Sequence, residues 1–325
     1  MDFELSDEQT MLRDVSRAML TAHCPAELVR AVAAEQHDLD DKLWQRGVEI
    51  GWTGLPVPES HDGAGMGLVE LCLVAEEIGR AVAPGPWTDT ALAAWAAAAG
   101  GAADDVVSAL ASGEQRAAVV IDAAFVHAAA AADWLLVVDE SVRLVRADGA
   151  DIRRRRVLDE SRGFYAVTAP PDDAVELSTD PQRIRDAAAI LVAADALGLG
   201  ERMMEMTIEY AKVRQQFGRP IGSFQVIKHK VADILISLKG VRAATYYAAM
   251  AFDAGLPDAP LAASVAKAFA AEQVTAIAGE ALQTHGGIGF TWEHDLHLYL
   301  RRAKTDEILG GDADFHHDRV AELLG

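Results

Sequence analysis

Hydrophobic residues recur at helical spacing through residues 1–114. Near the start of the chain, one apolar stripe is formed by Met11, Leu12, Val15 and Met19. Ser6 and Gln9 have the spacing of a capping box, which predicts a helix that begins just after Ser6. Two further helical stretches are predicted around residues 43–50 and over residues 68–82, with the turn-rich sequence LPVPESHDGAGMG between them. The pattern therefore predicts a helical N-terminal domain.

The pattern changes between residues 115 and 179. Short β-branched runs appear there, and Asp, Glu, Gly and Pro separate them, as is typical of strands joined by turns. The runs lie at residues 119–121, 135–138, 142–145 and 164–167. Pro170 and Pro171, followed by two aspartates, indicate a linker. We interpret this region as a small β domain.

Helical spacing returns after Pro181 and persists through residues 180–325. Apolar residues recur three, four and seven positions apart over residues 190–208 and 227–241, and a third helix is predicted over 261–282. Long helices joined by short loops indicate an antiparallel bundle. The predicted fold class is therefore α+β and mostly α.

The composition makes some functional classes improbable. A chain of 325 residues is long enough for two or three domains. The formal charge of −21 argues against nucleic-acid binding through an extended basic face. The only concentrated basic run is residues 153–156, which we interpret as a solvated turn or strand edge. No nucleic-acid partner is predicted.

No signal for secretion, membrane insertion or metal binding is recognised. The acidic start MDFELSDEQ lacks the regions of a signal peptide, and charged residues interrupt the apolar stretch 117–138. Cys24 and Cys72 show neither metal-ligand spacing nor a disulfide framework. The sequence DADFHHD at 312–318 contains possible metal ligands, but no second cluster completes a site, so we interpret it as a helix start. We predict a cytoplasmic protein without a metal or a membrane segment.

Two segments near the C-terminus carry a more specific signal. YAKVRQQFGRPIGSFQVIKHKVAD at 210–233 and QTHGGIGF at 283–290 resemble the signature of acyl-CoA dehydrogenases. These flavoenzymes remove a proton and a hydride from adjacent carbons of an acyl-CoA thioester. FELSDEQTMLRD, GWTGLPVPESHDGAGMG and VAEEIGR are similar to N-terminal segments of the same family. The resemblance implies a helical domain at 1–114, a β domain at 115–179 that is shorter than usual, and a four-helix bundle at 180–325.

The resemblance also implies a flavin site. In this family, flavin adenine dinucleotide (FAD) lies in an extended pose across a subunit interface, and a neighbouring subunit grips its adenosine end. The residues that would bind the ADP half are Arg214, Gln216, Phe217, Gln225, Gln283, Gly286 and Gly287. Arg214 would meet the pyrophosphate with forked, charge-assisted hydrogen bonds, and the glycines would permit close approach of the backbone. His285, between these groups, is interpreted as a structural or cofactor-wall residue.

The catalytic base of the family has no counterpart here. Its glutamate usually lies near the chain's end, where this sequence has Gly310, or early in the bundle's first helix, where it has Ala188. Proton abstraction needs a carboxylate positioned over the substrate's α-carbon. Glu307, Asp312 and Asp186 are near in sequence but off register, and three helical residues move a side chain by about 4.5 Å. No catalytic residue is therefore predicted in this chain.

The middle domain departs from the family as well. Members hold the flavin ring with a loop containing Thr-Glu-Pro followed by Gly-Ser-Asp, and neither string occurs here. The flavin-ring half of the site is therefore expected to be missing, whereas the ADP-binding half is retained.

This asymmetry resembles the short subunits of heteromeric α2β2 acyl-CoA dehydrogenases of actinobacteria, which act on CoA thioesters of steroid side chains and rings. The resemblance implies a full-length partner subunit that supplies the glutamate and the ring pocket, a shared FAD, an acyl-CoA substrate and electron-transfer flavoprotein as electron acceptor. Two alternatives remain open. One is a self-sufficient dehydrogenase with a displaced base such as Glu307, and the other is a non-catalytic scaffold or acyl-CoA-binding protein.

Overall fold

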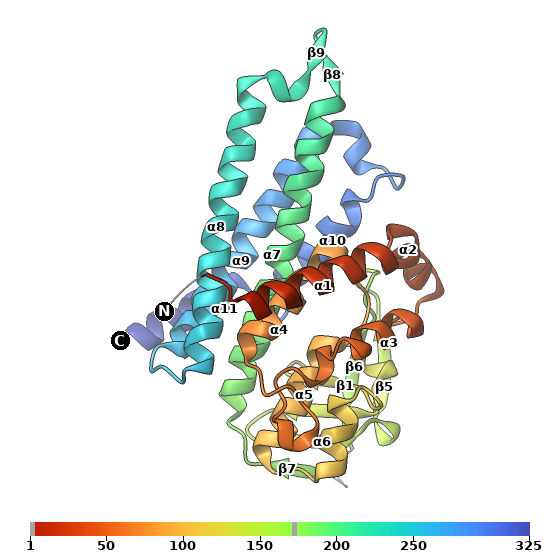
Figure 1. Cartoon of the computed structure of the whole chain (residues 1–325), viewed down its shortest axis with the longest axis vertical. Helices are drawn as coiled ribbons and strands as arrows, with labels where there is room; N and C mark the ends of the chain where they lie inside the picture. Colours follow the sequence, from red (N-terminus) through yellow and green to blue (C-terminus); the bar gives the residue numbers. More distant parts are fainter. Residues whose placement is uncertain (1–3, 171–173) are drawn as a thin grey trace.

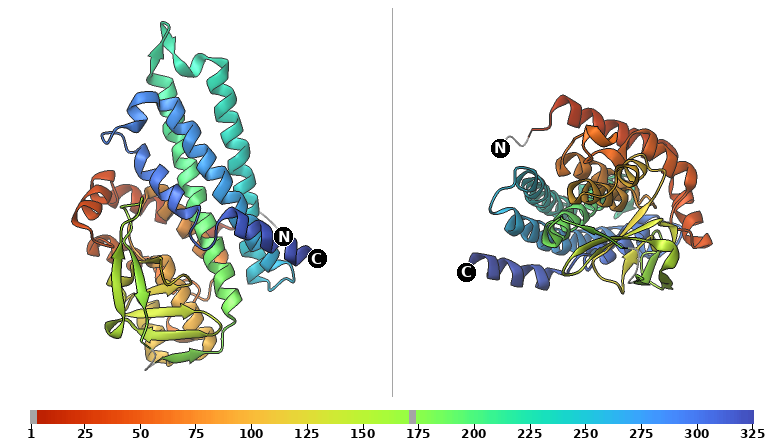
Figure 2. Two further views of the ribbon diagram at one scale, coloured as in Figure 1. Left: turned by 180° about the vertical axis from the view of Figure 1, so that it is seen from behind. Right: turned by 90° about the horizontal axis from the view of Figure 1, so that it is seen from below.

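The computed structural model describes residues 4–170 and 174–325. Long helices stand side by side, and the strands lie beside shorter helices toward one end of them (Figures 1 and 2). The N-terminal helices are α1 (Asp7–His23), α2 (Ala26–Glu35), α3 (Asp41–Glu49), α4 (Leu68–Ala81), α5 (Trp87–Gly100) and α6 (Asp104–Ala111). The capping box predicted at Ser6 and Gln9 is confirmed, because each side chain accepts a hydrogen bond from the other's backbone N–H. Pro171 of the predicted linker lies outside the described residues.

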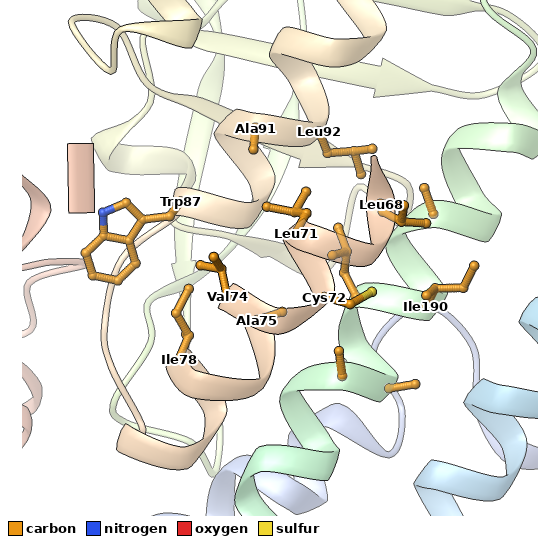
Figure 3. Close-up of a cluster of buried hydrophobic side chains, with 14 of the residues drawn as sticks. Leu68, Leu71, Cys72, Val74, Ala75, Ile78, Trp87, Ala91, Leu92 and Ile190 are labelled. Atoms are coloured by element: carbon orange, nitrogen blue, oxygen red, sulfur yellow. The ribbon is translucent and has the colours of Figure 1, made fainter. Parts of the chain in front are cut away.

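Helix α4 is the central element of the N-terminal region. Nearly every side chain from Leu68 to Gly79 is buried, so apolar residues surround this helix instead of forming one stripe. Figure 3 shows Ala75 and Ile78 of α4 near Trp87 of α5, and Ile190 of the first bundle helix on the other side. Helix α4 thus joins the N-terminal helices to the bundle.

Two glycines let α4 lie directly against the first bundle helix, α7 (Pro181–Val213). A Cβ atom added to Gly198 would lie 1.8 Å from the carbonyl oxygen of Glu76, and one added to Gly79 would lie 2.0 Å from the carbonyl oxygen of Asp195. Both distances are far below van der Waals contact, so the two backbones approach more closely than any side chain would allow. The mutual position of the N-terminal region and the bundle depends on this crossing.

The β region consists of two small sheets. The four predicted runs are found as strands β1 (Ala117–Val120), β3 (Trp134–Val138), β4 (Val142–Arg146) and β6 (Phe164–Thr168). Three more strands are β2 (Val126–His127), β5 (Asp151–Arg155) and β7 (Val175–Leu177). The sheet orders are β1-β3-β4-β7 and β2-β6-β5. The basic run 153–156 begins on β5, an outer strand with exposed arginines, in agreement with a solvated strand edge.

The C-terminal region is a bundle of long helices completed by shorter ones. They are α7, α8 (Gln225–Asp253), α9 (Ala259–His285), α10 (Leu296–Asp306) and α11 (Ala313–Leu324). The sequence DADFHHD starts α11 as predicted, with the Asp312 side chain accepting from Phe315 N–H. Within the described residues, no group of side chains suits a metal ion. None of the described helices is both long and apolar enough to cross a membrane.

Candidate functional site

The two C-terminal motifs lie at the same end of the bundle. Arg214 directly follows α7, a short hairpin of β8 (Gln215–Gln216) and β9 (Arg219–Pro220) comes next, and α8 starts at Gln225. Because α9 runs parallel to α7, its last residues reach the same end (Figures 1 and 2). There the ring of His285 stacks on that of Tyr210, with 4.6 Å between centroids. The structure therefore brings together segments that are about seventy residues apart in the sequence.

Most residues expected to hold the ADP half of FAD are exposed at this end. The exposed ones are Arg214, Gln216, Phe217, Gln225, Gln283 and Gly287, and Gly286 is half-buried. Within the described part of the chain, the Arg214 side chain has neither an ion pair nor a hydrogen bond. Gly286 has a φ of +62°, which favours glycine, and no atom lies within 4 Å of a Cβ built on Gly286 or Gly287. An unpaired guanidinium beside open backbone is suited to an anionic group such as a pyrophosphate.

The hairpin tip presents an aromatic ring to solvent. Phe217 and Gly218 have φ values of +51° and +76°, as in a two-residue turn of type I′. A positive φ is unusual for a bulky residue, and the Phe217 side chain is 92% exposed. Other large exposed apolar residues at this end are Val213, Val226, Ile288 and Phe290. Exposed rings and aliphatic groups gathered in one place are typical of a surface that another protein covers.

A separate cavity lies where α4, α5, α7, the β region and the loop after α10 meet. Its volume is about 280 Å³. Gly310 and Ala188, the two positions at which the family would carry its glutamate, both line this cavity. The sequence comparison with the family therefore pointed to one place in the fold from two distant segments. Neither residue offers a proton acceptor there.

The loop at Gly310 has a backbone conformation suited to glycine. The φ values are +75° at Gly310 and +107° at Gly311. Lys267 on α9 is buried, and its Nζ donates to the carbonyl oxygens of Glu307 at 3.1 Å and Gly311 at 2.7 Å. His316 Nε2 lies 3.1 Å from the carbonyl oxygen of Gly310. These contacts hold the loop at the cavity's edge.

Burial lowers the pKa of Lys267 to about 8, against the partial opposition of nearby carboxylates. Between pH 8 and the ordinary lysine pKa, the unfolded chain binds more protons at this site, so stability should rise with pH. We expect the stability difference between wild type and Lys267→Met to grow in favour of wild type by roughly 2 kcal/mol from pH 7 to 9.5. Urea denaturation at both pH values measures the free energy of unfolding of each protein. A difference between them that does not change with pH would contradict the lowered pKa of Lys267.

The acidic residues near the expected base positions form hydrogen bonds and ion pairs outside the cavity. Glu307 accepts hydrogen bonds from Thr275 at 3.2 Å and from Lys304, and Asp186 forms an ion pair with Arg319 at 2.7 Å. Asp312 caps α11. The side chains that line the cavity do not include Glu307, Asp312 or Asp186. The geometry thus gives no support to Glu307 as a displaced base.

Two aspartates that do line the cavity are bound to arginines. Arg302 Nε donates to Asp195 at 3.0 Å, and Arg162 Nη2 donates to Asp306 at 2.7 Å. Burial, together with the neighbouring carboxylate of Asp195, raises the pKa of Asp306 well above its ordinary value. Each of these aspartates is held by an arginine, so neither is a free carboxylate in the cavity. Sequence reasoning missed this network, because its members come from distant segments without a shared motif.

Comparisons with known proteins agree with these features. The family model "Acyl-CoA dehydrogenase, N-terminal domain" matches residues 6–124, and "Acyl-CoA dehydrogenase, C-terminal domain" matches residues 186–325. Acyl-CoA dehydrogenase IpdE2 of Mycolicibacterium smegmatis is 35% identical over 308 residues, which are 94% of this chain and 96% of that protein.

Two solved structures are similar over nearly their whole length. A chain of the Tcur3481–Tcur3483 steroid ACAD, G363A variant, is 29% identical with a TM-score of 0.91, and 98% of each chain is covered. A chain of the ChsE4–ChsE5 complex from Mycobacterium tuberculosis is 25% identical with a TM-score of 0.88, covering 100% of this chain and 99% of that one.

Proposed function

This chain belongs to the acyl-CoA dehydrogenase family. We propose that it is the subunit of a heteromeric enzyme whose bundle end, at Arg214, binds the ADP half of an FAD held by a partner subunit. The partner is a full-length family member that supplies the catalytic glutamate and the flavin-ring pocket. One observation carries the proposal. The bundle end at Arg214 is exposed and the Arg214 guanidinium has no partner among the described residues, whereas neither Gly310 nor Ala188 offers a carboxylate to the cavity.

The residues present fit the ADP half of the cofactor. Arg214 would bind the pyrophosphate, and Gln216 and Gln225 would add hydrogen bonds from the hairpin and from the start of α8. Gly286 and Gly287 leave room for the adenosine side, because no atom of the chain fills the space where a side chain would be. Bound FAD would supply the hydride acceptor for α,β-dehydrogenation of an acyl-CoA thioester. This chain's residues would orient it without taking part in the proton transfer.

The exposed apolar residues beside this site support a partner subunit that covers them. Phe217, Val226 and Phe290 have no cover within the described chain, although such residues are usually buried. Both similar structures carry paired names, Tcur3481–Tcur3483 and ChsE4–ChsE5, and the second is described as a complex. We therefore include an α2β2 assembly in the proposal. We also include electron-transfer flavoprotein as electron acceptor and a steroid-derived acyl group, the latter because Tcur3481–Tcur3483 is a steroid ACAD.

The ratio of flavin to polypeptide tests the proposal. We expect little flavin in the chain purified alone, and about one flavin per pair of unlike chains after co-expression with a full-length family member. The Arg214→Ala variant of the complex should bind FAD roughly 10- to 100-fold more weakly, because it loses charge-assisted hydrogen bonds to phosphate. Fluorescence titration of the apo-complex with FAD gives the dissociation constants.

The control is Arg46→Ala, which removes an exposed arginine of α3 that no described carboxylate pairs with. It should leave FAD affinity unchanged. One flavin per chain in the lone protein, together with turnover of an acyl-CoA, would instead favour a self-sufficient enzyme. Stable assembly and thioester binding without any flavin would favour the non-catalytic scaffold.

A further inference from the structure

The hairpin between α7 and α8 places a second arginine beside the candidate flavin-binding residues (Figure 1). Gln216 on β8 lies directly opposite Arg219 on β9. The hydrogen bond from Ile221 N–H to the Arg214 carbonyl oxygen, at 2.8 Å, continues the same register, and Arg214 has an extended backbone. Residues opposite each other in a ladder, and residues two apart along a strand, point to the same side. Arg214, Gln216 and Arg219 therefore share one face of the hairpin.

The Arg219 guanidinium is fixed in place but has no charged partner. It lies over the ring of Phe224, 4.3 Å from the centroid. Such a contact uses the face of the planar guanidinium, so its N–H groups, which lie in the plane, remain available to a ligand. Arg219 is exposed, and it forms no ion pair with any residue in the ranges 4–170 and 174–325. Phe224 directly precedes α8, so the guanidinium is held beside the first turn of that helix.

The start of α8 lacks the negative charge that usually stabilises a helix N-terminus. No side chain caps this helix of 29 residues, and its first turn contains no acidic residue. Instead, Lys228, His229 and Lys230 fall within the first six residues of α8, and only Lys230 forms an ion pair, with Glu280. Cations near the positive end of a helix dipole are unfavourable unless an anion lies there too. The first turn of α8 therefore supports an anionic ligand next to Arg219.

The bundle end at Arg214 is positively charged, although the formal charge of the whole chain is −21. Lys212, Arg214, Arg219 and Lys228 are all exposed there, and none of the four has an ion pair in the part of the chain that the structure describes. Unpaired cations gathered in one place attract an anionic ligand. The pyrophosphate of FAD carries two negative charges, of which a single guanidinium balances one.

We propose that Arg219 binds the FAD pyrophosphate together with Arg214, so that two guanidiniums balance its two charges. Stacking on Phe224 orients the Arg219 guanidinium, and its in-plane N–H groups donate to phosphate oxygens. The inference rests on the proposed function, because it concerns the same flavin-binding end. It adds a binding residue to which the sequence motif assigned no role.

Three substitutions of Arg219 in the co-expressed complex test the inference. Arg219→Met keeps an unbranched side chain that can lie on Phe224 but removes the charge, and it should weaken FAD binding about tenfold. Arg219→Lys keeps the charge and should stay within about threefold of wild type. Arg219→Glu opposes the phosphates and should weaken binding by about a hundredfold or more. Fluorescence titration of the apo-complex gives the dissociation constants. About 0.5 M KCl should narrow the difference between wild type and Arg219→Met.

Lys239→Ala is the matched control. It removes an exposed cation from the same helix, about 21 Å along the axis from Gln225, and should change FAD affinity by less than about twofold. Native mass spectrometry of each apo-complex shows whether the subunits still assemble. Wild-type affinity in Arg219→Met, or loss of assembly in that variant, would overturn the role of Arg219.

The Arg214→Ala variant separates this inference from the proposed function. If Arg214→Ala weakens FAD binding and Arg219→Met does not, the proposed function stands and Arg219 is not a pyrophosphate ligand. If neither variant weakens FAD binding, the proposed function fails as well. Weaker binding in both variants, with Arg219→Lys close to wild type, is the result that we expect.

Discussion

A Gly198→Ala substitution is expected to destabilise the folded chain by about 4 kcal/mol or more. The added methyl group would lie 1.8 Å from the carbonyl oxygen of Glu76 and 2.8 Å from the backbone nitrogen of Arg80. These are backbone atoms of α4, so they cannot move aside as the end of a flexible side chain could. The helices would have to separate, and the apolar core between them would open.

Urea denaturation followed by circular dichroism measures this effect. Gly279→Ala is the matched control, because Gly279 is also helical but exposed, and no atom lies within 4 Å of its added Cβ. The control should stabilise the chain by up to about 1 kcal/mol, the usual difference in helix propensity. If Gly198→Ala were as well tolerated as Gly279→Ala, the close crossing of α4 and α7 would be wrong.

Replacing Glu76 by alanine is expected to cost about 3–5 kcal/mol. Glu76 lies on α4 with 1% of its surface exposed, and it accepts hydrogen bonds from Arg242 at 2.7 and 3.1 Å and from the Tyr246 hydroxyl at 2.8 Å. Its removal leaves the Tyr246 hydroxyl buried without this acceptor and leaves Arg242 with Glu201 alone. Most of the free-energy cost comes from leaving the Tyr246 hydroxyl and the Arg242 guanidinium without this acceptor, and less from the loss of the Glu76–Arg242 ion pair itself.

The comparison is with Asp14→Ala, which breaks an exposed pair with Arg13 at 2.8 Å and should change stability by less than about 1 kcal/mol. A further variant, Glu76→Ala with Tyr246→Phe, should recover part of the loss, because it also removes the stranded hydroxyl. Equal effects of Glu76→Ala and Asp14→Ala, measured by urea denaturation, would show that the network does not hold α4 to α8.

Elements with clear periodicity could be predicted from the sequence, whereas evenly apolar ones could not. The capping box located the start of α1, the long stripes located parts of α7 and α8, and the predicted third helix matches α9 to within three residues at each end. Helix α5 gave no amphipathic signal, because alanines surround it and it is buried on nearly all sides. Strands β2 and β7 are only two and three residues long, too short for an alternating pattern.

The candidate site also has a part that the sequence could predict and a part that it could not. The ADP-binding residues lie in two compact motifs, so a single sequence was enough to locate them, although their role stays a prediction. The cavity wall is different, because Arg162 and Asp306 are 144 residues apart and meet only through the fold. His127 lies within the apolar stretch 117–138 and belongs to no recognised motif. Nothing near it in the sequence identifies Asp89 as its partner, 38 residues away. The domain boundaries and the cytoplasmic location also remain predictions.

The left-handed backbone at Gly310 has a consequence for the history of this protein. A glycine codon can become a glutamate codon by one nucleotide change, so a base lost by substitution alone could be regained easily. Here a glutamate at residue 310 would have to adopt a φ of +75°, which costs an ordinary residue about 1–2 kcal/mol, and Lys267 and His316 hold the adjoining carbonyls in place. A glutamate at residue 310 would therefore carry this strain unless the loop also changed its shape. Under the proposed function, the shape of this loop therefore opposes the return of a base at residue 310 and favours continued reliance on the partner.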